Sequence, residues 1–328
     1  MDVELSLCPK GRKLTIWKEF LARAGLEADL QVERTLLVWD GEELIATGSR
    51  QGNLLKCIAV DAARQGEGLT ATVLTGLRQD AFQAGHSHLF LYTKPKNKWM
   101  FSSLFFYPVA QTEDVLLMEN RRGGIKAFLD SLPTQSAEGV VGAAVMNCNP
   151  FTKGHRYLIE TAARECDRVY VFVLSEDRSA FSAKDRLEMV KLGTADLPNV
   201  QVLPTGPYLI SSATFPTYFL KEREKATAIQ CRLDIDIFTK YFVPKFGIQR
   251  RYVGTEPLSP MTNQYNEALR EYLPGAGIEL REIPRAELEG VPVSASAVRS
   301  FRDAGDLQRL QALVPESTWN YLYQHHLI

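Results

Sequence analysis

The residues with the clearest chemical potential lie in one short stretch. An apolar run ending at Met146 meets Asn-Pro-Phe at 149–151, which is followed by Thr152, Gly154 and His155. We expect a strand, a loop and the start of a helix, whose outward N–H groups and dipole suit phosphate. Gly154 permits a close backbone approach, and His155 can donate to a bridging or α-phosphate oxygen as charge develops. The stretch predicts a nucleoside triphosphate site; a capped helix with a surface histidine is the plainer alternative.

A second stretch, nearer the C-terminus, has the same character. Ser294, Ser296 and Arg299 stand at the expected start of a late helix, about 140 residues after the first stretch. Their hydroxyls and the backbone N–H groups suit the leaving β- and γ-phosphates, and the guanidinium can clamp them. Either serine could equally be an ordinary N-cap on a surface helix. The two stretches in this order support the triphosphate prediction better than either does alone.

Together the two stretches resemble the signatures of the nucleotidyltransferase superfamily, which read His- or Thr-x-Gly-His and Ser-x-Ser/Thr-x-x-Arg. The resemblance implies a Rossmann-like, cytidylyltransferase-like domain, in which an acceptor attacks the α-phosphate of ATP and pyrophosphate leaves. It implies catalytic roles for His155, Lys184 and Arg299. It implies ATP contacts from Asn147, Asn149, Phe151, Thr152, Gly154, His155, Arg186, Gly254, Thr255, Glu256, Ser294, Ser296 and Arg299.

Several of these residues have an alternative reading. Arg178, Lys184 and Arg186 follow the strand expected to end at Leu174, where they could contact phosphates or simply be solvated. The run Gly254-Thr255-Glu256 follows another expected strand, so it could bind the adenosine or a metal, or form a capping turn. These alternatives stay open on the sequence alone.

Two further features concern the acceptor. Asp234 and Asp236 alternate with apolar residues and could serve Mg²⁺, position a substrate, or cap a helix. Four hydroxyl residues, more than one helix cap needs, precede an expected helix: Ser211, Ser212, Thr214 and Thr217.

The hydroxyl run, Leu-Asp-Ile-Asp-Ile-Phe at 233–238 and Gly-Thr-Glu-Pro at 254–257 together resemble the citrate lyase ligase family over nearly the whole chain. The resemblance implies an acid–thiol ligase that forms a carbon–sulfur bond. It would use ATP and Mg²⁺ to acetylate the thiol prosthetic group, phosphoribosyl-dephospho-CoA, of the citrate lyase acyl carrier (gamma) subunit. Acetate would form acetyl-adenylate, with release of pyrophosphate and then AMP.

On this interpretation the acceptor contacts come from Ser211, Ser212, Thr214 and Asp234, and no metal ligands are assigned. Two rival functions stay open. One is a cofactor-biosynthetic adenylyltransferase acting on a phosphate monoester, and the other is an acetyl-CoA-dependent acetyltransferase.

The C-terminal half must position the phosphate stretches. Strands alternate with helices there, which predicts a doubly wound parallel sheet with ligands at the carboxyl ends of its strands. The expected strands are 140–147, 168–174, 200–203, 250–253 and 277–283, and the expected helices are 156–166, 183–192, 215–225, 263–272 and those from 296. Polar, turn-rich residues at 130–139 mark the boundary, which gives domains 1–132 and 139–328.

The N-terminal half reads as an α+β domain. We expect a helix at 14–28, a hairpin around Asp40-Gly41, a strand at 54–60, and a helix at 69–84 that Gly85 ends. A further strand is expected at 88–93.

The strand at 54–60 and the loop Gln65–Gly68 resemble the N-acetyltransferase (GNAT) fold, whose loop N–H groups hold the pyrophosphate of acetyl-CoA. Ala63 stands where that fold has Arg or Gln, and Arg64 and Gln65 are the neighbours that could compensate. This resemblance suggests that the domain holds the coenzyme-A-like arm of the carrier.

Composition limits the class of protein. The chain has 328 residues, 23% of them charged, with a net charge of −1. This balance argues against nucleic-acid or membrane binding driven by bulk charge. Five cysteines without a C-x-x-C pair favour free thiols in a reducing compartment. With no signal-peptide pattern at the N-terminus, we expect a cytoplasmic enzyme.

Overall fold

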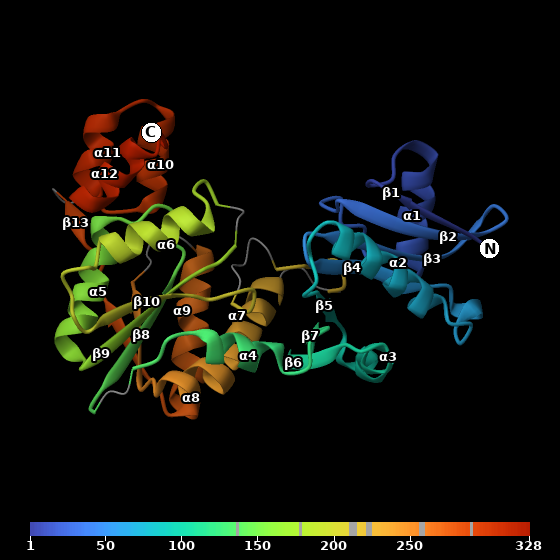
Figure 1. The fold of residues 1–328 in the computed structure, drawn as a ribbon, viewed down its shortest axis with the longest axis horizontal. Coiled ribbons are helices and arrows are strands. Elements are labelled where there is room, and N and C mark those ends of the chain that lie inside the picture. The colour runs from blue at the N-terminus through green and yellow to red at the C-terminus, as the bar shows by residue number, and fades with distance from the viewer. Residues whose placement is uncertain (136–137, 177–178, 210–214, 221–224, 256–259, 289–290) are drawn as a thin grey trace. The chain divides into compact units, whose positions relative to one another are not determined.

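A computed structural model describes residues 1–328 apart from 136–137, 177–178, 210–214, 221–224, 256–259 and 289–290 (Figure 1). By their internal contacts the residues form two compact units. Unit 1 comprises Met1–Gly124 with Pro216–Ile229, and unit 2 comprises Ile125–Phe215 with Gln230–Ile328. A segment from the later half of the chain therefore packs with the N-terminal unit.

Unit 1 is a mixed sheet with helices. Its strand order is β1-β2-β3-β4-β5-β7-β6, and every neighbouring pair is antiparallel except β4 and β5. The strands are β1 Asp2–Ser6, β2 Arg34–Asp40, β3 Glu43–Gln51, β4 Leu54–Val60, β5 Phe90–Thr93, β6 Tyr107–Gln111 and β7 Leu116–Glu119. The helices are α1 Gly11–Arg23, α2 Leu69–Gln83 and α3 Lys98–Ser103, with 3₁₀ turns at Ala62–Arg64 and Pro95–Asn97.

The parallel pair in unit 1 is short. β4 and β5 pair only at Leu54 with Phe90 and at Leu55 with Leu91. Beyond Lys56 the β4 chain bends at Cys57, whose φ of 51° is unusual for a residue other than glycine. β4 and β5 therefore separate toward the loop Gln65–Gly68, called the glycine loop below. This arrangement is the α+β domain that the sequence predicts; β1, β6, β7 and α3 were not predicted.

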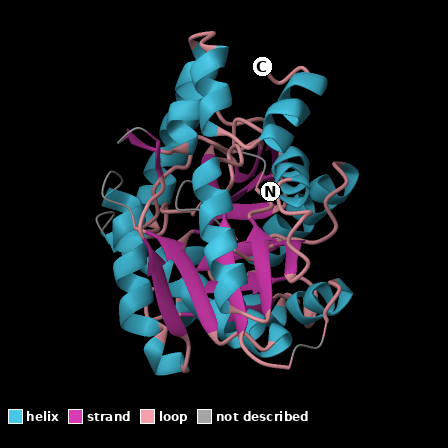
Figure 2. Cartoon of the chain, turned by 90° about the vertical axis from the view of Figure 1, so that its left-hand side faces the viewer, coloured by secondary structure: helices cyan, strands magenta, loops and turns pink. Residues whose placement is uncertain are grey.

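Unit 2 is built on a five-stranded parallel sheet in the order β10-β9-β8-β11-β12. Its strands are β8 Val141–Met146, β9 Arg168–Val173, β10 Val200–Pro204, β11 Arg250–Gly254 and β12 Glu279–Ile283, and a small hairpin joins β13 Glu287–Leu288 to β14 Val291–Pro292. Figure 2 shows the parallel strands side by side with helices packed over the sheet. The chain leaves β8 in one direction and returns to its other side with β11, so the switch point lies at the end of β8. The predicted fold class is confirmed.

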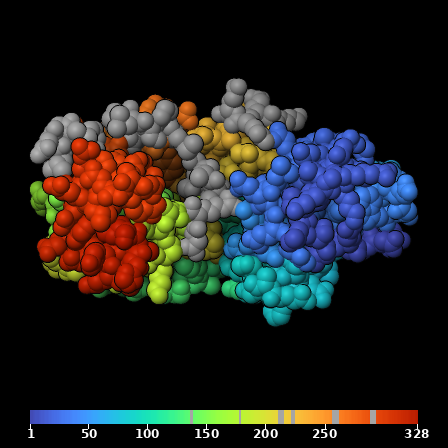
Figure 3. Space-filling model, turned by 90° about the horizontal axis from the view of Figure 1, so that it is seen from above, coloured from blue at the N-terminus to red at the C-terminus, as the bar shows by residue number. Residues whose placement is uncertain are grey.

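The helices of unit 2 cover both faces of that sheet. They are α4 Gly124–Ser131, α5 Lys153–Glu165, α6 Ala183–Leu192, α7 Ala226–Ile237 (its first turn in unit 1), α8 Val243–Phe246, α9 Pro260–Tyr272, α10 Ala295–Asp303, α11 Leu307–Leu313 and α12 Glu316–Gln324, with a π turn at Phe238–Phe242 and a 3₁₀ turn at Pro274–Ala276. The last three helices form one continuous region of the surface, red in Figure 3. Because side chains alternate along a strand, β9 directs Val171 toward the α5 side and Phe172 toward Phe242 and Phe246.

One predicted helix is wrong. The helix expected at 215–225 is not formed by the described residues 215–220, and α7 begins at Ala226. The carbonyl of Tyr218 accepts the N–H of Glu27, and its hydroxyl donates to the carbonyl of Tyr92. The backbone here therefore serves tertiary contacts within unit 1, and Pro216 supplies no N–H to a helix.

The division between the units falls earlier than the polar stretch at 130–139. Helix α4 packs in unit 2, where Phe128 lies 5.6 Å from Tyr208 between ring centroids. Asp130 at the end of that helix is paired with Lys245 at 2.7 Å. These contacts draw residues from Ile125 onward into unit 2.

Candidate active site

The start of α5 is organised by Thr152 and His155. Thr152 is the N-cap, and its Oγ1 accepts the backbone N–H of His155 at 3.3 Å. In return Nδ1 of His155 accepts the backbone N–H of Thr152 at 3.1 Å and lies 2.9 Å from the threonine Oγ1. This reciprocal pair is a capping box with histidine in the position usually taken by Glu or Gln. It holds the imidazole against the first turn of the helix.

These contacts determine which ring nitrogen of His155 carries a proton. Burial, and to a smaller extent the nearby positive charge of Arg285, lowers the pKa of His155 from 6.5 to about 4. The ring is therefore neutral near pH 7. Because Nδ1 accepts the N–H of Thr152, the single proton must reside on Nε2. His155 thus offers a neutral N–H donor beside a helix N-terminus.

The second predicted stretch lies beside the first. Ser294 is the N-cap of α10 and accepts the N–H of Ala297 at 3.1 Å. A Cβ added to Gly154 would meet the carbonyl oxygen of Val293 at 3.3 Å, so glycine allows the two helix starts to approach closely. The structure therefore brings together residues about 140 positions apart in the chain.

Arg299 links the same two stretches. Its Nη1 donates to the carbonyl of Asn149 at 2.6 Å, and its Nη2 donates to Ser296 Oγ at 3.2 Å. Burial, with a contribution from nearby Arg302, lowers the pKa of Arg299. The guanidinium braces the loop that precedes α5 while keeping a positive charge beside it.

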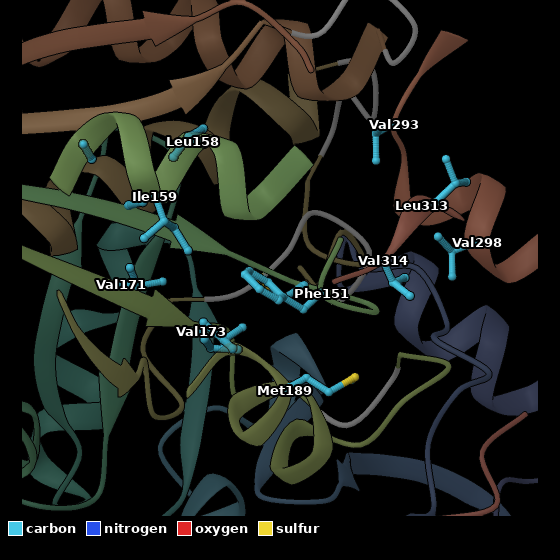
Figure 4. Close-up of a cluster of buried hydrophobic side chains, with 14 of the residues drawn as sticks. Phe151, Leu158, Ile159, Val171, Val173, Met189, Val293, Val298, Leu313 and Val314 are labelled. Carbon is cyan, nitrogen blue, oxygen red and sulfur yellow. The ribbon is translucent and has the colours of Figure 1, made fainter. Parts of the chain in front are cut away.

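Phe151 anchors the loop in the core of unit 2. Its side chain is fully buried, and Figure 4 shows it among the apolar residues of that core, between Met189 and Val314. A Cβ on Gly193 would meet the Phe151 ring at 2.3 Å, so the ring is packed tightly against α6. Its contacts are those of a packing residue that fixes where Thr152 begins the helix.

Arg186 is also buried, and its donors serve the protein itself. It donates to the carbonyls of Phe181 and Glu176, and to the carbonyl and Oδ1 of Asn147 at 2.8 and 2.5 Å. Asn149 Oδ1 accepts the N–H of Phe181 at 3.1 Å. Lys184 is exposed on the first turn of α6. The ATP contacts proposed for these residues stay predictions.

A cavity of about 230 Å³ opens at the carboxyl ends of the strands of unit 2. Six of the predicted residues line it: Asn147, Thr152, Gly154, His155, Gly254 and Thr255. Further polar residues that were not predicted also line it, among them Arg251, Asn266 and Arg285. Asn266 donates to the carbonyl of Gly254 at 3.0 Å, and the N–H of Arg285 donates to Thr255 Oγ1 at 3.2 Å. Thr255 and Gly254 are thus held from α9 and from the end of β12.

Of the remaining predicted site residues, the structure describes some and not others. Asp234 is buried on α7, where its Oδ2 accepts the hydroxyl of Tyr265 at 2.5 Å. Ser211, Ser212, Thr214, Arg178 and Glu256 lie outside the described residues. Among the residues that the structure describes, no group of three or more His, Cys, Asp or Glu side chains could hold a metal ion.

Unit 1 contains a larger cavity of about 970 Å³. Residues of β4 and β5, the glycine loop and the first turn of α2 line it, together with Tyr218 and Phe219 from the later half of the chain. Gly66 and Gly68 have φ values of 90° and 79°, which only glycine adopts easily. No side chain caps the start of α2. Arg64 is paired with Asp40 and Glu67 at 2.9 Å, so its charge is largely used within the protein.

Comparisons with known proteins concern most of the chain. A family model described as the citrate lyase ligase C-terminal domain matches residues 141–322. A protein of Klebsiella pneumoniae named [citrate [pro-3S]-lyase] ligase is 41% identical over 311 residues, 93% of this chain and 91% of that protein. An Escherichia coli K12 protein of the same name is 39% identical over 320 residues, 95% of this chain and 91% of that protein.

A solved structure with detectable similarity is Thermotoga maritima TmcAL bound with alpha-thio ATP. The TM-score is 0.34 and the identity 14%, over 57% of this chain and 56% of that one.

Within the described part of the chain, no helix has the length and apolar character needed to cross a membrane.

Proposed function

This chain belongs to the citrate lyase ligase family, and on that basis we propose that it acetylates the thiol prosthetic group of the citrate lyase acyl carrier subunit. In the first step a carboxylate oxygen of acetate attacks the α-phosphorus of ATP, and pyrophosphate leaves. In the second step the carrier thiol attacks the acetyl carbonyl of acetyl-adenylate, and AMP leaves. The observation that carries the proposal is the neutral His155, which presents an Nε2–H donor beside two adjoining helix starts.

Each group has a defined part in the first step. The N–H groups of α5 and the Nε2–H of His155 stabilise the charge that develops on the α-phosphate. A neutral donor suits this task because it needs no proton uptake near pH 7. The start of α10 with Ser296, together with Arg299, holds the leaving pyrophosphate. Mg²⁺ would enter with ATP, as the counter-ion of its phosphates.

The decisive assay is exchange of labelled pyrophosphate into ATP with and without acetate. We expect exchange that requires acetate, and we expect His155→Ala to lose about 2–4 kcal/mol of transition-state stabilisation, or roughly 30- to 1,000-fold in rate. Exchange that requires a phosphorylated acceptor would instead indicate a cofactor-biosynthetic adenylyltransferase. The absence of exchange would favour an acetyl-CoA-dependent acetyltransferase. Near-normal turnover of the His155 variant would refute its assigned role.

We further propose that unit 1 holds the coenzyme-A-like arm of the carrier and presents its thiol. The cavity of about 970 Å³ beside the glycine loop and the uncapped start of α2 supports this role. N–H donors there suit the pyrophosphate of the arm, and the space between β4 and β5 can accept its extended chain.

Thr70 offers a clean test because it lies on the first turn of α2 and lines the cavity, whereas Thr72 is exposed and does not line it. Thr70→Asp puts a negative charge against the pyrophosphate without weakening the helix start. We expect the KM for the carrier to rise at least about tenfold, roughly 1.4 kcal/mol, with acetate-dependent exchange unchanged. Thr72→Asp is the matched control. Equal effects of the two variants, or none from Thr70→Asp, would contradict a role of unit 1 in holding the arm.

A further inference from the structure

Arg251 is a buried arginine with two donor nitrogens that have no hydrogen-bond partner among the described residues. It lies within β11 and is only 2% exposed. Its Nε and Nη1 have no hydrogen-bond partner among the residues that the structure describes. The guanidinium stacks over the ring of Phe238, with 4.5 Å from its central carbon to the ring centroid. A buried charge-bearing donor without an acceptor is costly, because it loses water and gains nothing in return.

The surroundings of Arg251 act on its charge in two directions and leave Nε and Nη1 without a partner. Burial lowers its pKa, while the field of Tyr265 and Asp234 raises it. Asp234 Oδ2 already accepts the hydroxyl of Tyr265 at 2.5 Å. The acidic side chain behind Arg251 therefore supplies electrostatic support, and the N–H groups are left for a ligand.

The position of Arg251 in the cavity and the geometry of its donors indicate the class of ligand. Arg251 lines the same cavity of about 230 Å³ as Asn147 and His155, at the ends of β8 and α5. A guanidinium presents planar, paired N–H donors that match the two oxygens of a carboxylate. Stacking on Phe238 fixes the plane of these donors.

We propose that Arg251 binds the carboxylate of the acyl substrate and positions it for attack on the α-phosphate; this rests on the acetyl-adenylate function proposed above. One carboxylate oxygen forms the new bond to the α-phosphorus as the bond to the bridging oxygen of pyrophosphate breaks, and the electron pair leaves with pyrophosphate. The carboxylate loses its negative charge in this step. The hydrogen bonds between Arg251 and the acetyl group are therefore weaker once acetyl-adenylate has formed, when the thiol must reach the acetyl carbonyl.

The test measures the KM for acetate and for ATP separately in acetate-dependent pyrophosphate exchange. Arg251→Met keeps a long apolar side chain and removes the charge, while Arg251→Lys keeps the charge and removes the paired geometry. We expect the KM for acetate to rise about 10- to 100-fold in Arg251→Met and less in Arg251→Lys, as losing hydrogen bonds to a charged group would predict. The KM for ATP should stay within about twofold.

Thermal unfolding without substrates distinguishes binding from a structural role. Because Arg251 lacks hydrogen-bond partners on Nε and Nη1, the Tm of Arg251→Met should equal or exceed that of the parent. Arg168→Met is the matched control, since Arg168 also has an unpartnered Nε but does not line the cavity of about 230 Å³. It should leave the KM for acetate unchanged.

Three outcomes would overturn the assignment of Arg251. They are an unchanged KM for acetate, a parallel rise in the KM for ATP, which would indicate a phosphate ligand, and a lower Tm in both Arg251 variants, which would indicate a structural residue. A parent enzyme without acetate-dependent exchange would be a different result, because then the proposed function itself fails.

Discussion

The pKa of His155 makes a quantitative prediction about stability in acid. In the folded protein this pKa is about 4, compared with an ordinary value of 6.5. The unfolded chain therefore binds a proton at His155 at a higher pH than the folded chain does. Stability from this group is complete above pH 6.5 and is lost as the pH falls toward 4, because the unfolded state gains protons first.

The size of the effect follows from the difference of about 2.5 pH units. At about 1.36 kcal/mol per unit, His155 should remove about 3 kcal/mol from the free energy of unfolding between pH 6.5 and 4. A His155→Gln variant lacks this titration but keeps an amide that can accept the N–H of Thr152. Urea denaturation at a series of pH values measures both proteins, and the difference between them isolates the contribution of this residue.

We therefore expect the variant to gain stability relative to the parent as the pH is lowered from 6.5 to 4. The exposed His326, in the same unit, supplies a variant that controls for the loss of an imidazole elsewhere. Parallel pH profiles for the parent and His155→Gln would refute the argument that His155 is neutral. They would also remove the basis for assigning its proton to Nε2.

Two other predictions concern contacts that hold the cavities in shape. Phe151→Ala should cost about 3–5 kcal/mol of stability, because it empties a fully buried, tightly packed position; calorimetry on the purified protein would show a lower Tm, and an unchanged Tm would contradict the anchoring role. Tyr218→Phe removes the hydrogen bond to the carbonyl of Tyr92 and should cost about 1 kcal/mol. The variant should also be cleaved faster by protease within unit 1, while its acetate-dependent exchange stays unchanged. Loss of exchange would contradict the expectation that the effect of this substitution is limited to unit 1.

The contiguous part of the site could be predicted well from the sequence. The strand, loop and helix at 141–165 form one continuous signal, because an apolar strand is followed directly by a capping threonine and an amphipathic helix. The pairing with the late helix at Ser294 could also be predicted, from the order and character of two motifs. Local chemistry is sufficient for both.

Other features depend on contacts that local patterns do not reveal. Residues 215–220 have an amphipathic appearance, yet Tyr218 and Pro216 are committed to unit 1, so tertiary contacts override helix formation. Arg250-Arg251 looks like a solvated pair at a strand start. Alternation along β11 instead separates them: Arg250 pairs with Glu279, while Arg251 is buried beside Phe238. That alternation was the one signal by which the sequence could have identified Arg251.

The four arginines near the site show why charge alone is a weak guide to ligand contact. Arg186 and Arg299 were natural candidates for phosphate, but both use donors on the carbonyls of the loop at 147–149. Such bracing fixes the loop, and in Arg299 it leaves Nη2 beside Ser296 at the start of α10, where the proposed function places the leaving pyrophosphate. Arg251 has the opposite pattern: its Nε and Nη1 have no partner among the described residues, and it stacks on Phe238. Arg285, whose charge lowers the pKa of His155, helps to keep that ring neutral. Substitution of Arg251 should therefore raise the KM for acetate most selectively, because its Nε and Nη1 are without partners among the described residues.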